Sequence, residues 1–235
     1  MNVFAVPGEV FSEVKASPGT PMNWLVPAIL AAIVGVISVI IIFSQPNIQQ
    51  QFREQFAKVW EQQVKAGTMT QAQADETQNA VEKVLEPTTL KILFSIREVI
   101  FSFLRVVWWG FILWLLAKWL LKIDISFLKG MEVAGLALMI SVLGAIVSLL
   151  LIVNFGKMGA TPSLALAVQD FDATRKSHLF MGAANIFSFW QVGVISVGLA
   201  KLADVPFLKA AWVVFTYWVL QECFLILTGL GQMAM

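Results

Sequence analysis

The sequence predicts an all-α polytopic membrane protein with five transmembrane helices, because it contains five separate apolar runs that are each long enough to cross a bilayer. A hydrocarbon core of about 30 Å needs roughly 20 apolar helical residues at a rise of about 1.5 Å each. The runs that meet this length are 24–43, 99–121, 133–153, 183–202 and 210–230. Every backbone amide in lipid must be paired within its own segment, so these runs are expected to be helical.

Composition supports this class and argues against others. Hydrophobic residues make up 58% of the chain and charged residues 13%. A net charge of +1 provides no basic field for nucleic acid, so no such partner is expected. Cys223 is the single cysteine, which rules out an intrachain disulfide. The first apolar run is too long for a signal-peptide core, and we interpret it as an uncleaved anchor within one membrane domain, 1–235.

Residues 1–23 are predicted to contain a short amphipathic helix at the membrane interface. Pro7 suits the first turn of a helix, and Phe11 and Val14 then share a face opposite Glu13. The apolar face has two interpretations. It either packs against the ends of the spans, which we favour, or contacts lipid or a partner.

Residues 44–93, between the first two spans, are predicted to form a helical hairpin outside the lipid. Phe56 and Trp60 lie at helical spacing in its first half, and Thr70 with Gln73 forms a capping box that starts a second helix. The hairpin is either a docking element anchored by Trp60 or an element whose apolar faces pack on each other and on the span ends. We favour packing, because exposed apolar stripes are a liability.

Small residues recur along one face of the first and third spans, where they allow two helix backbones to approach closely. They are Ala28, Ala32 and Gly35, and Ala137, Ser141, Gly144 and Ser148. We interpret both stripes as packing seams inside the bundle, although the same stripes could serve a homo-oligomer.

Two charged residues lie inside apolar runs, Arg105 in the second and Glu222 in the fifth. A carboxylate in lipid is costly enough to need a partner or a proton. Alternating helix directions would bring both residues to a similar depth, so we predict that they face one another. The pair is either a structural ion pair or part of a proton or ion path that Asn185, Gln191 and Gln221 would also line. These five side chains are the candidate functional residues within the membrane.

Residues that usually carry catalysis are scarce. His178 is the sole histidine, and no serine follows the pattern of a nucleophile elbow. Asp170 and Asp172 could bind a cation or a headgroup, but two carboxylates without further ligands are a weak metal site. No enzyme activity, cofactor or metal is therefore expected. A lipid-directed enzyme using Asp170, Asp172 and His178 is the least favoured alternative.

The last two spans carry a family resemblance, which rests on a string of residues with some agreement before the first span. The residues are Asn185, Ile186, Phe187, Ser188, Phe189, Trp190, Gly193, Val197, Gly198, Leu199, Ala200, Lys209 and Ala210, preceded by Pro7, Phe11 and Pro18. Together with five spans in this order, they resemble the YIP (Ypt-interacting protein) domain family. The resemblance covers almost the whole chain.

The resemblance implies a five-span bundle and a role in membrane organisation or protein traffic. Similar eukaryotic proteins bind Rab-type GTPases and one another. This chain has a tail of only about 20 residues before its first span and a long loop after it, which resembles the prokaryotic branch more closely. We therefore expect a non-enzymatic membrane scaffold or adaptor, with a membrane-protein partner or a second copy as its target. A small transporter or channel through Arg105 and Glu222 is the alternative.

The resemblance also implies an integral protein of the bacterial cytoplasmic (inner) membrane, with its amino terminus in the cytoplasm and its carboxyl terminus outside. Basic residues near the span ends address orientation independently. Lysines such as Lys15, Lys122 and Lys209 are denser on the amino-terminal side, whereas the other side carries more basic residues over longer loops. Density therefore favours the same orientation, and raw count opposes it.

Overall fold

The computed structural model describes residues 2–82 and 85–229, and it confirms the predicted all-α membrane fold. Five helices in this part of the chain are long and apolar enough to cross a membrane. They are α2 (Met22–Ile42), α5 (Pro87–Leu115) with its π-helical continuation η1 (Leu116–Leu121), α6 (Phe127–Phe155), α8 (Ile186–Ala203) and α9 (Phe207–Thr228). The predicted end of the last span, residue 230, lies outside the described residues.

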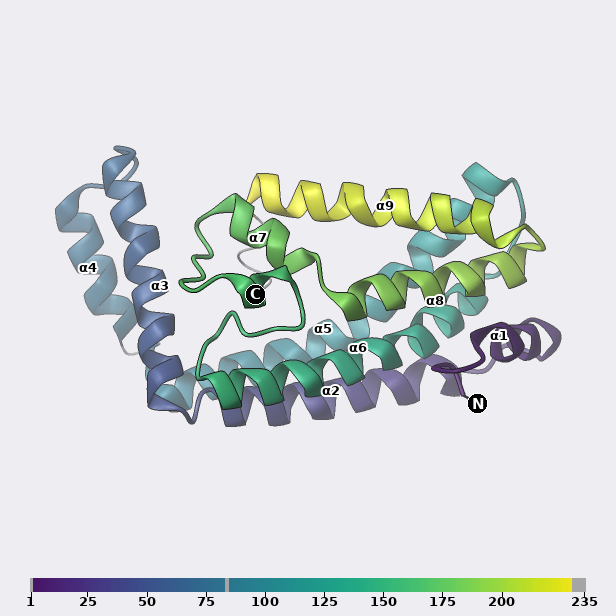
Figure 1. Cartoon of the computed structure of the whole chain (residues 1–235), viewed down its shortest axis with the longest axis horizontal. Helices are drawn as coiled ribbons and strands as arrows, with labels where there is room; N and C mark the ends of the chain where they lie inside the picture. Colours follow the sequence, from purple (N-terminus) through teal and green to yellow (C-terminus); the bar gives the residue numbers. More distant parts are fainter. Residues whose placement is uncertain (1, 83–84, 230–235) are drawn as a thin grey trace.

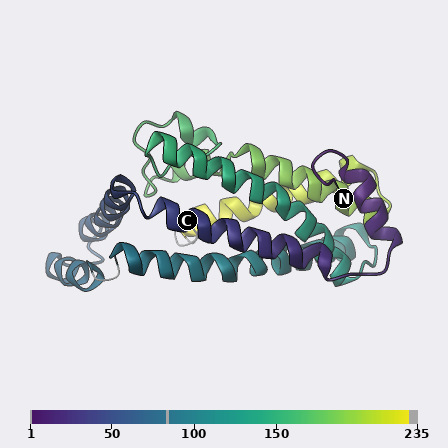
Figure 2. The same ribbon diagram turned by 90° about the horizontal axis from the view of Figure 1, so that it is seen from below.

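Shorter elements lie at the two ends of this bundle. They are α1 (Pro7–Ala16), α3 (Pro46–Lys65), α4 (Gln71–Glu82), the 3₁₀ turn η2 (Leu164–Ala167) and α7 (Lys176–Ala183). Figure 1 shows the spanning helices running along the long axis, with α1 at one end and the hairpin of α3 and α4 across the other. Figure 2 shows the same separation from a second direction. Helix α1 and the hairpin therefore lie at opposite ends of the bundle of spanning helices.

Three helix starts differ from the predicted spans: α5 and α6 begin before their apolar runs, and α8 begins later than predicted. Ser126 caps α6 by accepting a hydrogen bond from the Lys129 amide, 3.2 Å away, so this helix starts before residue 133. Pro87 occupies the first turn of α5, well before residue 99. Asn185 caps α8 and separates it from α7, so residue 183 ends one helix rather than starting another.

The hairpin has the predicted local chemistry. The Thr70 amide donates to Gln73 Oε1 at 2.9 Å, and the Gln73 amide donates to Thr70 Oγ1 at 3.3 Å, which is the reciprocal capping box. Gly67 adopts φ +70° after the end of α3, a conformation that glycine takes without a Cβ penalty. Local polar chemistry therefore defines the turn between α3 and α4.

Helix α6 is the centre of the bundle and packs against α2, α5 and α8. Glycines make its closest contacts possible. A Cβ on Gly135 would lie 2.3 Å from the Cα of Trp24 in α2, and one on Gly130 would lie 2.7 Å from the carbonyl oxygen of Gly110 in α5. Backbone meets backbone at both crossings, so neither site has room for a side chain.

The small-residue stripes face other helices of the same chain. Ala28 and Ala137 are fully buried, and Ala32 is nearly so. Gly144 lies against the Phe187 ring of α8, and Gly198 of α8 lies against Val133 of α6. Several members of both stripes are thus occupied by packing within the protomer.

Helix α1 is packed onto the bundle by its apolar face. Val10, Phe11 and Val14 are buried in the same cluster as residues of α6 and α8, and the Phe4 ring meets Trp190 edge-on at 6.1 Å between centroids. Packing against the span ends is therefore the interpretation of the amino-terminal helix that the structure supports.

We predict that Gly135→Ala destabilises the protein, although alanine normally favours a helix over glycine by about 1 kcal/mol. The new methyl group would overlap the α2 backbone, and overpacking of this kind costs about 1 to 3 kcal/mol. The melting temperature in mild detergent should fall. Gly193→Ala is the matched control, because no atom lies within 4 Å of its Cβ position, and it should leave the melting temperature unchanged or raised. An unchanged melting temperature for Gly135→Ala would contradict the close crossing.

Candidate functional site

The predicted ion pair between Arg105 and Glu222 is corrected by the structure. Arg105 Nη2 lies 3.6 Å from Glu98 Oε2, and no ion pair joins Arg105 to Glu222 among the described residues. Glu98 precedes Arg105 by two turns of α5. Side chains on a helix point back toward its amino terminus, so Arg105 reaches its own helix rather than α9. Arg97 Nη2 approaches the other oxygen of Glu98 at 3.8 Å.

The contact between Glu98 and Gly35 of α2 indicates that Glu98 lies within the membrane. A Cβ on Gly35 would lie 3.1 Å from Glu98 Oε2 and 3.2 Å from its Cβ, so this glycine of α2 makes room for the carboxylate. Gly35 lies in the interior of α2, about two turns from its end. Our predicted span began at residue 99 and missed Glu98. The seven-residue spacing from Glu98 to Arg105, which places both on one face, could have revealed the pair.

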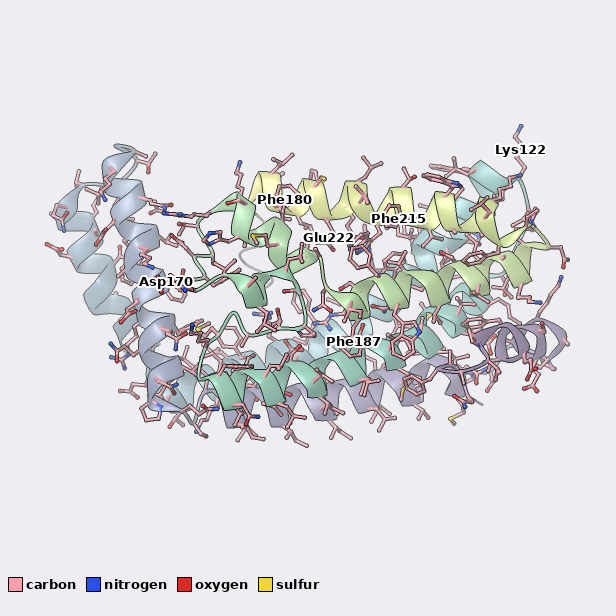
Figure 3. The ribbon with its side chains drawn as sticks, viewed as in Figure 1. Lys122, Asp170, Phe180, Phe187, Phe215 and Glu222 are labelled. Atoms are coloured by element: carbon pink, nitrogen blue, oxygen red, sulfur yellow. The ribbon has the colours of Figure 1, made fainter. Side chains whose placement is uncertain are left out.

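Helices α5 and α9 meet one turn away, next to Glu222. Gln221 Oε1 accepts hydrogen bonds from Trp108 Nε1 at 3.1 Å and from the Tyr217 hydroxyl at 2.7 Å. Arg105 and Glu222 therefore lie at similar depths without pairing. Figure 3 shows Glu222 below the ribbon of α9, on the side that faces the bundle. Its carboxylate has no hydrogen bond or ion pair within the described part of the chain.

The other predicted lining residues are satisfied separately. Ser141 Oγ donates to Gln191 Oε1 at 2.6 Å, which joins α6 to α8. Asn185 Oδ1 accepts from the Phe187 amide at 2.9 Å as the cap of α8. In the part of the chain that is described, no hydrogen bond or ion pair links any two of the five candidate polar residues of the membrane.

A buried charged residue that the sequence analysis missed lies at the α1 end of the bundle. Glu132 of α6 is 0% exposed. Its Oε1 accepts from the Thr20 amide at 3.0 Å and from Asn23 Nδ2 at 2.8 Å, while Oε2 lies 3.0 Å from Lys129 Nζ. This last contact lacks hydrogen-bond directionality and is an ion pair. We call these four residues the α1 junction.

The α1 junction connects three elements at one point. Lys129 Nζ also donates to the carbonyls of Val14 and Ser17, the latter at 2.8 Å. These carbonyls belong to the end of α1, where a positive charge is favourable. A second ion pair, Lys15 with Asp204, joins the same end of α1 to the cap of α8. Lys129 and Glu132 lie one helical turn apart next to an apolar run, and this spacing could have predicted their ion pair from the sequence.

At the opposite end, amide side chains of α3 hold the loop that follows α6. Gln51 Nε2 donates to the Gly156 carbonyl at 2.7 Å, and Gln51 Oε1 accepts from the Met158 amide at 3.1 Å. Asn47 Nδ2 donates to the same Gly156 carbonyl at 3.0 Å. Each side chain binds main-chain atoms rather than loop side chains.

The same arrangement recurs one turn further along α3. Gln55 Nε2 donates to the Phe171 carbonyl at 3.0 Å, and its Oε1 accepts from the Ala173 amide at 3.3 Å. Gln62 Nε2 then donates to Thr174 Oγ1 at 2.7 Å. Asn47, Gln51, Gln55 and Gln62 share a face of α3, and we call them the amide ladder. It fastens the hairpin to the loop, and the sequence analysis did not predict it.

The loop carboxylates and His178 do not form a catalytic group. Asp172 Oδ1 accepts from the amide and hydroxyl of Thr174 at 2.9 and 2.6 Å, and Asp172 Oδ2 lies 3.7 Å from Arg175 Nε. His178 Nδ1 accepts from the Asp172 backbone amide at 3.0 Å, so it meets the main chain and not the carboxylate. Asp170 is exposed. Searched over the described residues, the chain has no cluster of three potential metal ligands.

The environment of Asp172 sets its ionisation. Burial raises the pKa of this carboxyl group, but the hydrogen bonds from Thr174 and the charges of Lys58 and Arg175 outweigh it and lower the pKa below its usual value. The ionised form is therefore the one that stabilises the loop.

We predict a pH-dependent contribution from this carboxylate. Because its pKa is lowered by folding, its stabilisation is complete above about pH 4 and is lost as the pH falls through the lower, folded value. Asp172→Asn should lower the melting temperature at neutral pH, and the difference from the wild type should shrink as the pH falls through the folded pKa of Asp172. Asp170→Asn, which changes an exposed carboxylate nearby, should have no effect at neutral or low pH. A difference between wild type and Asp172→Asn that persists at low pH would contradict the assignment.

We predict that Glu132→Gln loosens the α1 junction. Removing one charge of a buried pair leaves the other uncompensated and costs about 3 kcal/mol. The melting temperature should fall, and amides of α1 should exchange hydrogen faster with solvent. Glu9→Gln, on the exposed side of α1, is the control. Equal exchange in the two variants would show that the buried pair does not hold α1.

Comparison with known proteins assigns the chain to a family. No curated protein and no solved structure matches it. The family model described as the Yip1 domain matches residues 1–230, which is nearly the whole chain and includes α1, the hairpin and all five spanning helices. The chain therefore belongs to the Yip1 domain family of membrane proteins.

Proposed function

We propose that this protein is a non-enzymatic membrane scaffold or adaptor of the YIP type, which acts in membrane organisation or protein traffic. One observation carries the proposal. Apart from Glu222, the candidate polar side chains of the membrane pair separately, as Arg105 does with Glu98 and Gln191 with Ser141. A conduit needs its polar residues to meet around a common path, whereas a scaffold needs each one satisfied where it lies.

The hairpin is suited to be the docking element of this scaffold. Its α3 is held on one face by the amide ladder and on another by edge-to-face aromatic rings, with centroids 5.2 Å apart for Phe43 and Phe52 and 5.0 Å for Phe52 and Phe56. Trp60 continues this row at 6.0 Å from Phe56. Helix α4 contacts α3 and projects from the bundle, as Figure 1 shows. A preorganised arm of this kind presents its outer surface to a membrane-protein partner at low entropic cost.

Location and orientation extend the proposal. We place the protein in the bacterial cytoplasmic membrane, with α1 on the cytoplasmic side and the hairpin outside. The concentration of lysines at the α1 end, including Lys118, Lys122 and Lys209, supports this orientation.

A small transporter or channel is the second candidate, and Glu222 is the observation that favours it. This carboxylate lies in a spanning helix, faces the bundle and has no ion pair among the described residues. Intramembrane carboxylates commonly belong to proton or ion paths.

We predict that a protein partner binds through the hairpin. The tagged full chain would be captured from native membranes in mild detergent, beside Gln51→Ala/Gln55→Ala, which releases the hairpin from its loop. Recovery of the partner should fall several-fold. Gln50→Ala/Gln63→Ala is the matched control, because Gln50 bonds only the exposed Glu54 and Gln63 makes no side-chain contact to the loop.

Two further variants separate the candidates. Arg105→Ala and Glu222→Ala should retain the partner, because neither residue lies in the hairpin. Reconstituted vesicles would be tested in parallel for proton flux with an entrapped pH-sensitive dye. Absence of a partner, together with a flux that both variants lose, would overturn the scaffold and establish the transporter.

A further inference from the structure

A groove on the side of the bundle lies between the end of α5 and α9, and the function proposed above does not use it. Its volume is about 380 Å³, within the range typical of small-molecule sites. The groove is lined by Ile112, Leu115, Leu116, Trp119, Leu120 and Tyr217. Its walls are apolar apart from the tyrosine hydroxyl, which is already bonded to Gln221.

The π-helix η1 shapes one wall of the groove. Leu116, Trp119 and Leu120 belong to it, and its wider turn follows 29 residues of ordinary α-helix. Short π-helical segments in proteins occur frequently at functional sites. Trp119 is 71% exposed and Leu120 is 60% exposed, so large apolar side chains stand at the surface here without protein to cover them.

Three lysines lie in the elements that form the end of the groove nearest α1. Lys118 is part of η1, Lys122 ends it at φ +59°, and Lys209 lies in the first turn of α9. The two helices run in opposite directions, so the end of η1 and the start of α9 meet at one end of the bundle, where Figure 3 labels Lys122. None of the three lysines has an ion pair within the described residues.

Acidic residues do not balance these charges. Asp204 at this end is engaged by Lys15, and Glu132 by Lys129. Asp124, in the connection after η1, is a single carboxylate against three lysines. Residues 116–126 and 207–210, which form this end of the groove, therefore carry a net positive charge.

Tryptophans place this end of the groove at headgroup depth. Trp212 of α9 is 65% exposed and Trp119 of η1 more so, and exposed tryptophans are enriched at the interface between hydrocarbon and water. Lys118 Nζ lies 5.0 Å from the centroid of the Trp114 ring, a cation–π contact of the same interface. From this end, the apolar lining of the groove continues toward the membrane centre as far as Ile112.

We propose that this groove binds an anionic phospholipid, with an acyl chain along the apolar wall and the phosphate among Lys118, Lys122 and Lys209. The occupant must combine a negative head with an apolar tail, in the order that the lysines and the apolar residues follow along the helices. A free anion would leave the exposed Trp119 and Leu120 uncovered, and a zwitterionic lipid would not neutralise the lysines. The site does not depend on the scaffold function.

The test measures lipid retained by the purified full chain. The protein would be exchanged into detergent with equal amounts of phosphatidylglycerol and phosphatidylcholine, and bound lipid would be quantified by mass spectrometry. We expect selective retention of phosphatidylglycerol and a loss of about tenfold or more in Lys122→Gln/Lys209→Gln, because each basic residue near an anionic headgroup contributes substantially. Lys157→Gln/Lys176→Gln removes the same charge at the opposite end and should retain the lipid as the wild type does.

Three outcomes would overturn the proposal. They are equal loss of phosphatidylglycerol in the two double variants, equal retention of phosphatidylcholine by the wild type, and displacement of the lipid by inorganic phosphate. A further variant, Leu120→Glu, places a negative charge on the exposed apolar wall. It should lower phosphatidylglycerol retention while the melting temperature without added lipid stays unchanged, because this side chain lies at the surface.

Discussion

Close approach of helix backbones on α6 is the constraint on which the rest of this structure depends. Lipid tails are as apolar as the helix surfaces, so burial of apolar area does not hold spanning helices together as it does in water. Contact between backbones must supply that attraction. Gly130 and Gly135 let α5 and α2 reach the α6 main chain, and Gly144 receives the Phe187 ring of α8. Helix α9 lies outside this arrangement and packs mainly on α8, which leaves the apolar groove open beside α5.

Polar interactions add to this close packing at three levels along the bundle. At one membrane face the α1 junction buries Glu132 with Lys129. Along α5, the half-exposed Arg105 side chain meets Glu98 on its own helix. At the other face the amide ladder holds the hairpin to the loop after α6. Hydrogen bonds and ion pairs thus attach α1 and the hairpin to the bundle. The spanning helices are held together mostly by close packing of their surfaces.

Length and hydropathy were enough to predict the five spans, because the thickness of the bilayer sets the same minimum length for each of them. They could not place Glu98 or Glu132, since both carboxylates lie just before the apolar windows, in turns by which α5 and α6 extend beyond them. The partner of Arg105 was misassigned for the same reason. The amide ladder escaped prediction because most of its bonds go to main-chain atoms, which carry no signature in the loop sequence; only Gln62 bonds a loop side chain, the Thr174 hydroxyl.

This bonding to main-chain atoms gives the loop after α6 an unusual tolerance to change during evolution. Gln51 and Gln55 grip carbonyl and amide groups that every residue other than proline possesses. These bonds therefore do not depend on the side chain at position 173, whereas Met158 also packs beside the buried cluster of Ile48, Ile152 and Ala160. Homologous sequences can differ at the exposed positions of this segment, and in what those positions recognise, without detaching the loop from the hairpin.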